Sequence, residues 1–125
     1  HMNAINWFEI PALDLDRAFV FYNTVLQGNV RKGTFDNGDL ILFNVPFNTG
    51  EAVGGSIVVR PDLQPSTEGS VLYLNAFGKL SEAVSKVEQA GGKVLVQKIN
   101  LGKFGFAAII IDSEGNKIGL LSNEE

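Results

Sequence analysis

Apolar and polar residues along the chain predict two similar series of short elements. Residues 4–10 alternate as a strand that Pro11 is expected to end, because proline cannot donate to a sheet ladder. A helix is expected next, with Asp14 as its N-cap and Gly28 as its stop, since apolar residues then recur three and four positions apart. This apolar stripe consists of Leu15, Ala18, Phe19, Tyr22, Val25 and Leu26.

Three extended segments follow the predicted helix, at residues 30–35, 40–45 and 54–59. The first two flank a turn at 36–39 that contains Asn37-Gly38. Both of these residues tolerate positive φ, so this pair between apolar runs favours a β-hairpin. The order of the first series is therefore strand, helix and three strands.

The same order returns after a turn-rich connector at residues 60–69. A strand is expected at 70–76 and then a helix that ends at Gly91-Gly92, followed by extended segments at 93–97, 106–111 and 117–122, with a turn at 112–116. The second helical stripe consists of Leu80, Ala83, Val84 and Val87. An offset of about 64 residues places Trp7 over Val71 and Gly28 over Gly92, which indicates an internal repeat.

The repeat predicts an α+β fold of two βαβββ modules, each with a curved four-stranded sheet and one helix. The 125 residues are expected to form one domain, with module 1 at about 4–60, a linker at about 61–69 and module 2 at about 70–123. The composition, 45% hydrophobic and 19% charged, is typical of a globular protein. His1, which precedes Met2, is interpreted as a cloning remnant and excluded from functional reasoning.

Composition excludes several kinds of chemistry and partner. The chain has no cysteine and its one histidine is His1, so nucleophilic Ser-His-Asp and Cys-His arrangements are ruled out. The net charge is −4 and the lysines and arginines are scattered, so nucleic acid is not an expected partner. Neither a signal peptide nor a run of about 20 apolar residues occurs. A cytoplasmic protein without a membrane partner is therefore expected.

Three segments together resemble the vicinal-oxygen-chelate (VOC) superfamily. They are Trp7–Pro11 continuing through Asp14–Ala18 and Phe21-Tyr22, then Ala90–Val94, and finally Asp112–Ile118. This superfamily includes glyoxalase I, extradiol dioxygenases, and fosfomycin and bleomycin resistance proteins. The resemblance implies two modules that form a cup from curved sheets, usually completed by a homodimer, with a divalent metal in the metal-dependent members.

The positions that correspond to the metal ligands of this superfamily are Trp7, a residue near Gly55, Val71 and Gly119. None of these side chains can bind a metal, because an indole only donates, valine is apolar and glycine has no side chain. A shift of one residue would replace Gly55 by Ser56, a poor ligand. We therefore expect neither a metal nor another cofactor.

Polar candidates for a site are Glu9, Tyr73 and Asn75. Glu9 alternates with Trp7 on the first strand, so both are expected to face the cup. Glu9 would act as a general base or as a partner for a ligand's polar group; alternatively, it is a carboxylate satisfied by neighbouring strands or exposed at the cup mouth. Tyr73 is the repeat equivalent of Glu9, so Glu9, Tyr73 and Asn75 would form either a ligand-orienting cluster or a structural network between the modules.

Aromatic candidates for the pocket wall are Trp7, Phe104 and Phe106. Core packing is the alternative for all three and is favoured for Phe106. Phe104 lies in the glycine-flanked segment 102–105, which would serve as a mobile cover over the cup.

Three functions follow from these features. The first is a metal-free homodimeric protein of the bleomycin-resistance type that binds a small, largely apolar molecule. The second is a VOC enzyme, a glyoxalase-type lyase or isomerase or a dioxygenase, with unrecognised metal ligands or with Glu9 and Tyr73 as acid and base. The third is an interaction module whose cup is filled by its own side chains. The vacated metal positions favour the first and disfavour metal-dependent glyoxalase or dioxygenase activity.

Overall fold

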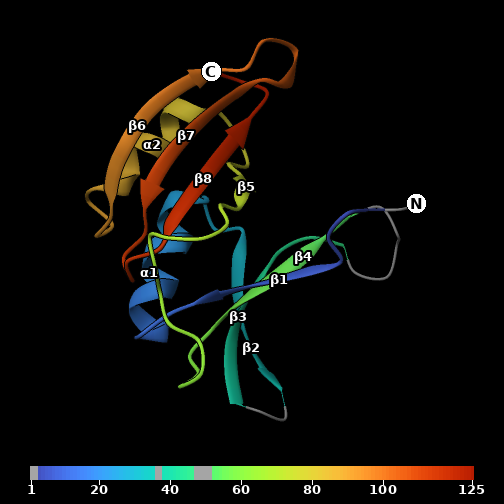
Figure 1. Cartoon of the computed structure of the whole chain (residues 1–125), viewed down its shortest axis with the longest axis vertical. Coiled ribbons are helices and arrows are strands. Elements are labelled where there is room, and N and C mark those ends of the chain that lie inside the picture. The colour runs from blue at the N-terminus through green and yellow to red at the C-terminus, as the bar shows by residue number, and fades with distance from the viewer. Residues whose placement is uncertain (1–2, 36–37, 47–51) are drawn as a thin grey trace.

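Two βαβββ modules make up the chain in the computed structural model, which describes residues 3–35, 38–46 and 52–125 (Figure 1). The elements of the first module are β1 (Trp7–Pro11), α1 (Leu15–Val25), β2 (Val30–Phe35), β3 (Gly38–Phe43) and β4 (Gly54–Val58). Those of the second are β5 (Tyr73–Asn75), α2 (Leu80–Val87), β6 (Lys93–Asn100), the short 3₁₀ helix η1 (Gly102–Phe104), β7 (Phe106–Ile111) and β8 (Lys117–Ser122). The predicted fold class and element order are confirmed.

Each module forms its own four-stranded sheet, with the strand orders β1-β4-β3-β2 and β5-β8-β7-β6. In both sheets the first and last strands of the module are parallel neighbours, with Ile10 opposite Ile57 and Leu74 opposite Leu120. The other pairs are antiparallel. The two sheets are therefore built by the same rule, as a repeat requires.

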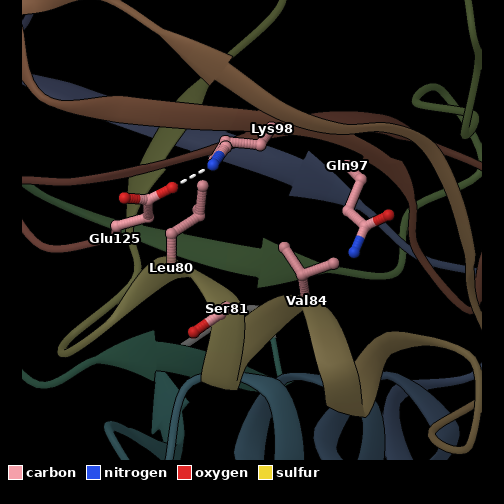
Figure 2. Close-up of a pocket in the computed structure, with 6 residues that line it drawn as sticks. All are labelled: Leu80, Ser81, Val84, Gln97, Lys98 and Glu125. Carbon is pink, nitrogen blue, oxygen red and sulfur yellow. Dashed lines mark hydrogen bonds and ion pairs between the residues drawn. The ribbon is translucent and has the colours of Figure 1, made fainter.

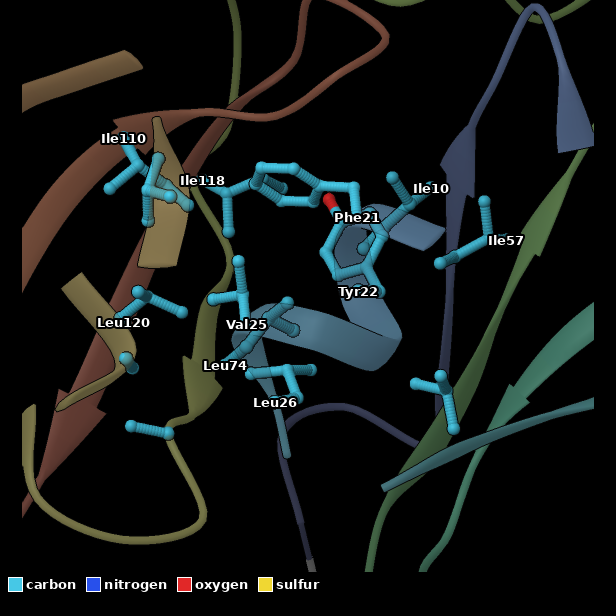
Figure 3. Close-up of a cluster of buried hydrophobic side chains, with 14 of the residues drawn as sticks. Ile10, Phe21, Tyr22, Val25, Leu26, Ile57, Leu74, Ile110, Ile118 and Leu120 are labelled. Atoms are coloured by element: carbon cyan, nitrogen blue, oxygen red, sulfur yellow. The ribbon is translucent and has the colours of Figure 1, made fainter. Parts of the chain in front are cut away.

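One hydrophobic core joins the two modules, because both helices and the inner sides of both sheets contribute to it (Figure 3). Helix α1 begins after Asp14, whose side chain accepts from the Arg17 N–H at 3.1 Å, as the predicted N-cap should. Phe21 lies outside the predicted stripe but is fully buried. Because α1 packs between the two sheets, a wider part of its surface is covered than a single sheet would cover. Neither described helix combines the length and the apolar character needed to cross a membrane.

Pro11 is the last residue of β1, whereas the sequence pattern ended the strand before it. The Ala12 N–H donates to the Val58 carbonyl, so the neighbouring Pro11 nitrogen points away from β4. On that free side the Pro11 carbonyl accepts from Asn116 Nδ2 at 2.7 Å. The proline therefore removes no ladder hydrogen bond, which is why it is tolerated at this sheet edge.

Other strand boundaries also differ from the predicted ones. β3 starts at Gly38 and ends at Phe43, and Phe35 pairs with Gly38 to close the predicted hairpin; Asp36 and Asn37 of the predicted turn lie outside the described residues. β5 has only three residues, and β6 extends to Asn100 through two register shifts against β7. Bulges of this kind let a strand continue past a local break in pairing.

The turn after β7 fastens the second module to the first through the buried Asp112. Its Oδ2 accepts from the Tyr22 hydroxyl of α1 at 2.5 Å and from Asn116 Nδ2 at 2.9 Å. Its Oδ1 accepts three backbone N–H groups of the same turn, those of Glu114, Gly115 and Asn116. Burial raises the pKa of the Tyr22 phenol well above its usual value, and the negative Asp112 raises it further, so the hydroxyl keeps its proton. One carboxylate thus shapes the turn and docks it on α1.

Glu114, in the same turn, binds the start of α1. Its buried carboxylate accepts from the backbone N–H groups of Leu13 and Asp14, both at 2.8 Å, and from Arg17 Nε at 2.7 Å and Nη2 at 3.0 Å. The Ser113 hydroxyl donates a further bond at 2.9 Å. Burial alone would raise the pKa of Glu114, but these hydrogen bonds outweigh it and lower the pKa from 4.5 to about 2.

We expect Asp112→Ala to reduce the free energy of unfolding by about 3 kcal/mol, because the Tyr22 hydroxyl and the Asn116 amide lose a buried partner. Tyr22→Phe removes only one of these bonds and should cost about 1–2 kcal/mol. Urea unfolding monitored by circular dichroism measures both values. Glu68→Ala, at an exposed position, is the control and should be near neutral. A loss below that of Tyr22→Phe for Asp112→Ala would contradict the docking role.

The lowered pKa of Glu114 predicts a pH dependence of stability. A carboxyl whose pKa falls from 4.5 to about 2 on folding contributes about 3 kcal/mol above pH 4.5, and this contribution is lost as the pH falls toward 2. The difference in unfolding free energy between wild type and Glu114→Gln should therefore be constant from pH 7 to about 5 and shrink below it. Urea unfolding at several pH values measures this difference. A difference that did not change with pH would show that the carboxylate charge is unimportant.

Candidate functional site

Each of the two sheets has an outer side that does not face the shared core. Since both inner sides face the shared core and side chains alternate along a strand, the outer sides face away from the helices. We call the outer side of the first sheet, with Trp7, Glu9 and Ser56, open face 1. The outer side of the second sheet, with Tyr73, Asn75 and Gly119, is open face 2. Trp7 is 43% exposed and Tyr73 is 52% exposed, so each face presents a half-exposed aromatic ring.

On open face 1, Glu9 forms an ion pair with Arg60, a residue that the sequence analysis did not single out. Arg60 Nη1 and Nη2 each donate to one Glu9 oxygen at 2.8 Å. Arg60 Nε lies 3.4 Å from Asp62 Oδ1. Ser56 pairs with Glu9, and residues two apart along a strand share a face. The spacing of Ser56, Val58 and Arg60 therefore places Arg60 on the same face as Glu9, and this alternation is the sequence signal that could have identified it.

The strand register corrects the position of one expected metal-ligand equivalent. Gly55 pairs with Phe8 on the core side of the sheet, where a Cβ would lie 2.4 Å from the Phe8 ring. Ser56 instead shares open face 1 with Glu9. The equivalent of Gly119 in the first module is therefore Ser56, one residue later than Gly55, because both lie opposite an outward residue of the first strand.

On open face 2, the Tyr73 ring covers Gly119, where a Cβ would meet the ring at 2.4 Å. The Asn75 side chain accepts from the Phe77 backbone N–H at 2.8 Å. Phe77 has a φ of 56°, so Asn75 stabilises a strained turn. Within one chain, Glu9 lies on open face 1 whereas Tyr73 and Asn75 lie on open face 2. The three residues therefore do not form the expected polar cluster within a single chain.

The remaining aromatic candidates have different environments. Phe104 is 66% exposed in η1, next to Gly105, whose φ is 96°. Phe106 packs against the hydrophobic core, the location that its alternative role in packing requires.

Three hollows bear on a ligand site. The largest of the three, about 490 Å³, lies between α2 and β6 (Figure 2). None of the candidate site residues lines it. It is lined by Leu80, Ser81, Val84, Gln97, Lys98 and Glu125, and Lys98 pairs with Glu125 across it. A groove of about 300 Å³ separates β1 from the linker and β8. A hollow of about 110 Å³ lies beside Glu9 and Arg60 on open face 1.

The residues at the metal-ligand positions do not fit a metal. Trp7, Val71 and Gly119 offer no acceptor atom in their side chains, and Ser56 offers one neutral hydroxyl. Within the described residues, no three acidic or histidine side chains gather closely enough to hold an ion. The chemistry of the donor set therefore gives no place for metal-dependent catalysis at these positions.

We compared the sequence and the fold with those of known proteins. No protein-family model and no curated protein matches the sequence, but solved structures match its fold. A glyoxalase/bleomycin resistance protein from Albidiferax ferrireducens T118 superimposes with a TM-score of 0.68 at 18% identity, over 95% of this chain and 98% of its own. The chain therefore has the two-module fold of glyoxalase/bleomycin resistance proteins.

Two further solved structures match the fold with similar values. A glyoxalase/bleomycin resistance protein from Streptomyces sp. CB03234 gives a TM-score of 0.64 at 21% identity, over 93% of this chain and 97% of its own. Lactoylglutathione lyase from Agrobacterium tumefaciens gives 0.58 at 18% identity, over 96% and 93%. Proteins named for resistance and for lyase activity thus share this fold, so function has to be argued from this chain's own residues.

The register correction predicts unequal costs for two glycine substitutions in this chain. Gly55→Ala should cost about 2 kcal/mol, because its methyl group collides with Phe8, which packs on Phe43 with ring centroids 5.2 Å apart. Gly119→Ala should cost less than about 1 kcal/mol, because the half-exposed Tyr73 ring can turn into solvent. Urea unfolding midpoints measure the two costs. An equal or larger cost for Gly119→Ala would contradict the assignment of Gly55 to the core side.

Proposed function

We propose that this chain binds a small, largely apolar molecule without a metal, in a cup formed by open face 1 of one copy and open face 2 of a second copy. The exposed aromatic residues on the two open faces carry the proposal. Soluble monomers rarely leave large contiguous apolar surfaces in water, and such surfaces mark binding sites or interfaces. Among the described residues of the open faces, the large apolar side chains of Trp7, Phe35, Tyr73 and Val96 are each more than 40% exposed.

The arrangement of the modules supports a second copy. α1 and α2 occupy the space between the two sheets, so one chain cannot bring its own open faces together without dismantling its core. A homodimer brings open face 1 of each copy to open face 2 of the other. Trp7 and Glu9 then meet Tyr73 and Asn75 from the partner copy, and both faces lose contact with water.

The ion pair of Glu9 supports binding over acid-base catalysis. Arg60 engages both oxygens of Glu9 at 2.8 Å, so proton abstraction by Glu9 would have to break or share this ion pair. The lack of metal-binding side chains at the equivalent positions argues in the same direction. For these two reasons, a metal-free VOC enzyme with Glu9 and Tyr73 as acid and base is only the second candidate. A cytoplasmic location stays a prediction.

The third candidate, an interaction module with a filled cup, has less support. A filled module would have no cavity above about 300 Å³, the low end for ligand pockets, whereas the hollow between α2 and β6 measures about 490 Å³. That hollow lies outside the open faces, however, so the state of the cup itself depends on the second copy.

The only tryptophan of the chain, Trp7, is a direct reporter for this proposal. Titration with indane, a neutral apolar probe, should shift Trp7 fluorescence to shorter wavelength in the presence of EDTA. Tyr73→Ala should weaken indane binding about tenfold, since loss of an aromatic contact of this kind costs about 1–1.5 kcal/mol. Sedimentation velocity should give a dimer for both proteins.

Mixing two variants tests whether the cup contains residues of two copies. Trp7→Phe removes the reporter, and Tyr73→Ala weakens the site. In a mixed dimer, one cup combines the Trp7 of one copy with the Tyr73 of the other, so the mixture should regain a tight-binding fluorescent fraction that neither variant has alone. A monomer that binds indane would refute the two-copy cup, and absence of indane binding by the wild-type protein would refute the proposed function.

A further inference from the structure

We infer that Arg60 is the hydrogen-bond donor that selects neutral ligands carrying an oxygen acceptor, such as a ketone or an amide. This inference rests on the proposed function and names the class of ligand that the cup would take. It concerns a residue that neither the repeat nor the fold resemblance singles out.

Arg60 is held from two sides on open face 1. Nη1 and Nη2 donate to the two oxygens of Glu9, each at 2.8 Å, and Nε lies 3.4 Å from Asp62 Oδ1. A planar guanidinium fixed in this way loses less side-chain freedom when it binds a further group. The guanidinium is therefore oriented before any ligand arrives.

The guanidinium keeps donors for a ligand. Each terminal nitrogen carries two N–H groups, and Glu9 takes one from each. One N–H on each terminal nitrogen therefore remains beyond the ion pair. The side chains of Arg60 and Glu9 are both 37% exposed, so the pair is still open to the face on which a ligand would lie.

An apolar wall lies next to these donors. The hollow of about 110 Å³ at this place is bordered by Phe35, Leu40 and Val58 as well as by Glu9 and Arg60. An apolar ring in the cup would place a polar substituent of its own beside the guanidinium. Sites that bind small molecules in a fixed orientation usually have apolar walls with a small number of precisely placed polar groups.

The local charge decides which acceptor is favoured. Glu9, Asp62 and Arg60 together carry a net charge of −1. A ligand carboxylate would meet this negative surplus, and a ligand ammonium would meet the guanidinium itself. A neutral carbonyl oxygen accepts from Arg60 without either repulsion. The arrangement therefore favours neutral oxygen acceptors over ions.

The test compares 1-indanone, indane and indane-2-carboxylate, which share a ring system and differ in the polar group. Isothermal titration calorimetry on the wild-type protein should give a Kd for 1-indanone about tenfold lower than for indane, as one hydrogen bond to a charged donor provides. The carboxylate should bind more weakly than 1-indanone. Equal affinities for 1-indanone and indane, or tighter binding of the carboxylate, would overturn the inference while leaving the proposed function in place.

Two variants assign the preference to Arg60. The double variant Glu9→Met and Arg60→Met replaces the ion pair by apolar side chains, so indane binding should persist while the preference for 1-indanone falls below about twofold. Arg60→Lys, which keeps the charge and loses the planar fork, should reduce the preference at least about threefold. Thermal unfolding confirms that each variant is folded.

The control removes an ion pair elsewhere. The double variant Asp16→Met and Lys32→Met eliminates the exposed pair between α1 and β2, in which the two charged atoms lie 3.0 Å apart. It changes the charge in the same way and should leave all three affinities unchanged. Retention of the ketone preference in both Arg60 variants would overturn the inference. Failure of both 1-indanone and indane to bind the wild-type protein would instead refute the proposed function together with it.

Discussion

The buried carboxylate of Asp112 is the constraint on which the relation of the two modules depends. Its five accepted hydrogen bonds combine a local task, the shape of the turn, with a long-range one, the bond to Tyr22 of α1. Glu114 adds bonds to the start of the same helix. A carboxylate that is buried and fully hydrogen-bonded fixes geometry strongly, because each unmet partner would be costly.

The docking of the two modules determines which side of each sheet is buried and which side faces outward. Because the buried sides of α1 and α2 pack with the inner sides of both sheets into one core, the outer sides of the sheets are left for other contacts. The aromatic rings on those sides and the ion pair of Glu9 with Arg60 lie where a ligand or a second copy can reach them. The turn at residues 112–116 thus affects the two open faces from a distance, because it fixes how the modules that carry them are oriented.

The element order could be predicted from sequence because each helix stripe, N-cap and hairpin turn is a local pattern. Features that depend on packing between modules could not. Phe21 is buried because a second sheet covers α1, and Asp112 finds Tyr22 across 90 residues of chain. The alternation on β1 correctly placed Trp7 and Glu9 on one face. The slip from Ser56 to Gly55 arose because two adjacent glycines, Gly54 and Gly55, show no inside-outside pattern.

The edges of the two sheets differ in how they treat an approaching strand. The outer edges, β2 and β6, carry Arg31 and Lys32 on one and Lys93 and Lys98 on the other, and β6 is also broken by two register shifts. Positive charges and bulges at an edge discourage unlimited strand addition. β1 and β5 contain no lysine or arginine. Each module therefore has one outer edge at which positive charge, and in β6 also irregular pairing, opposes fibrous growth by strand addition.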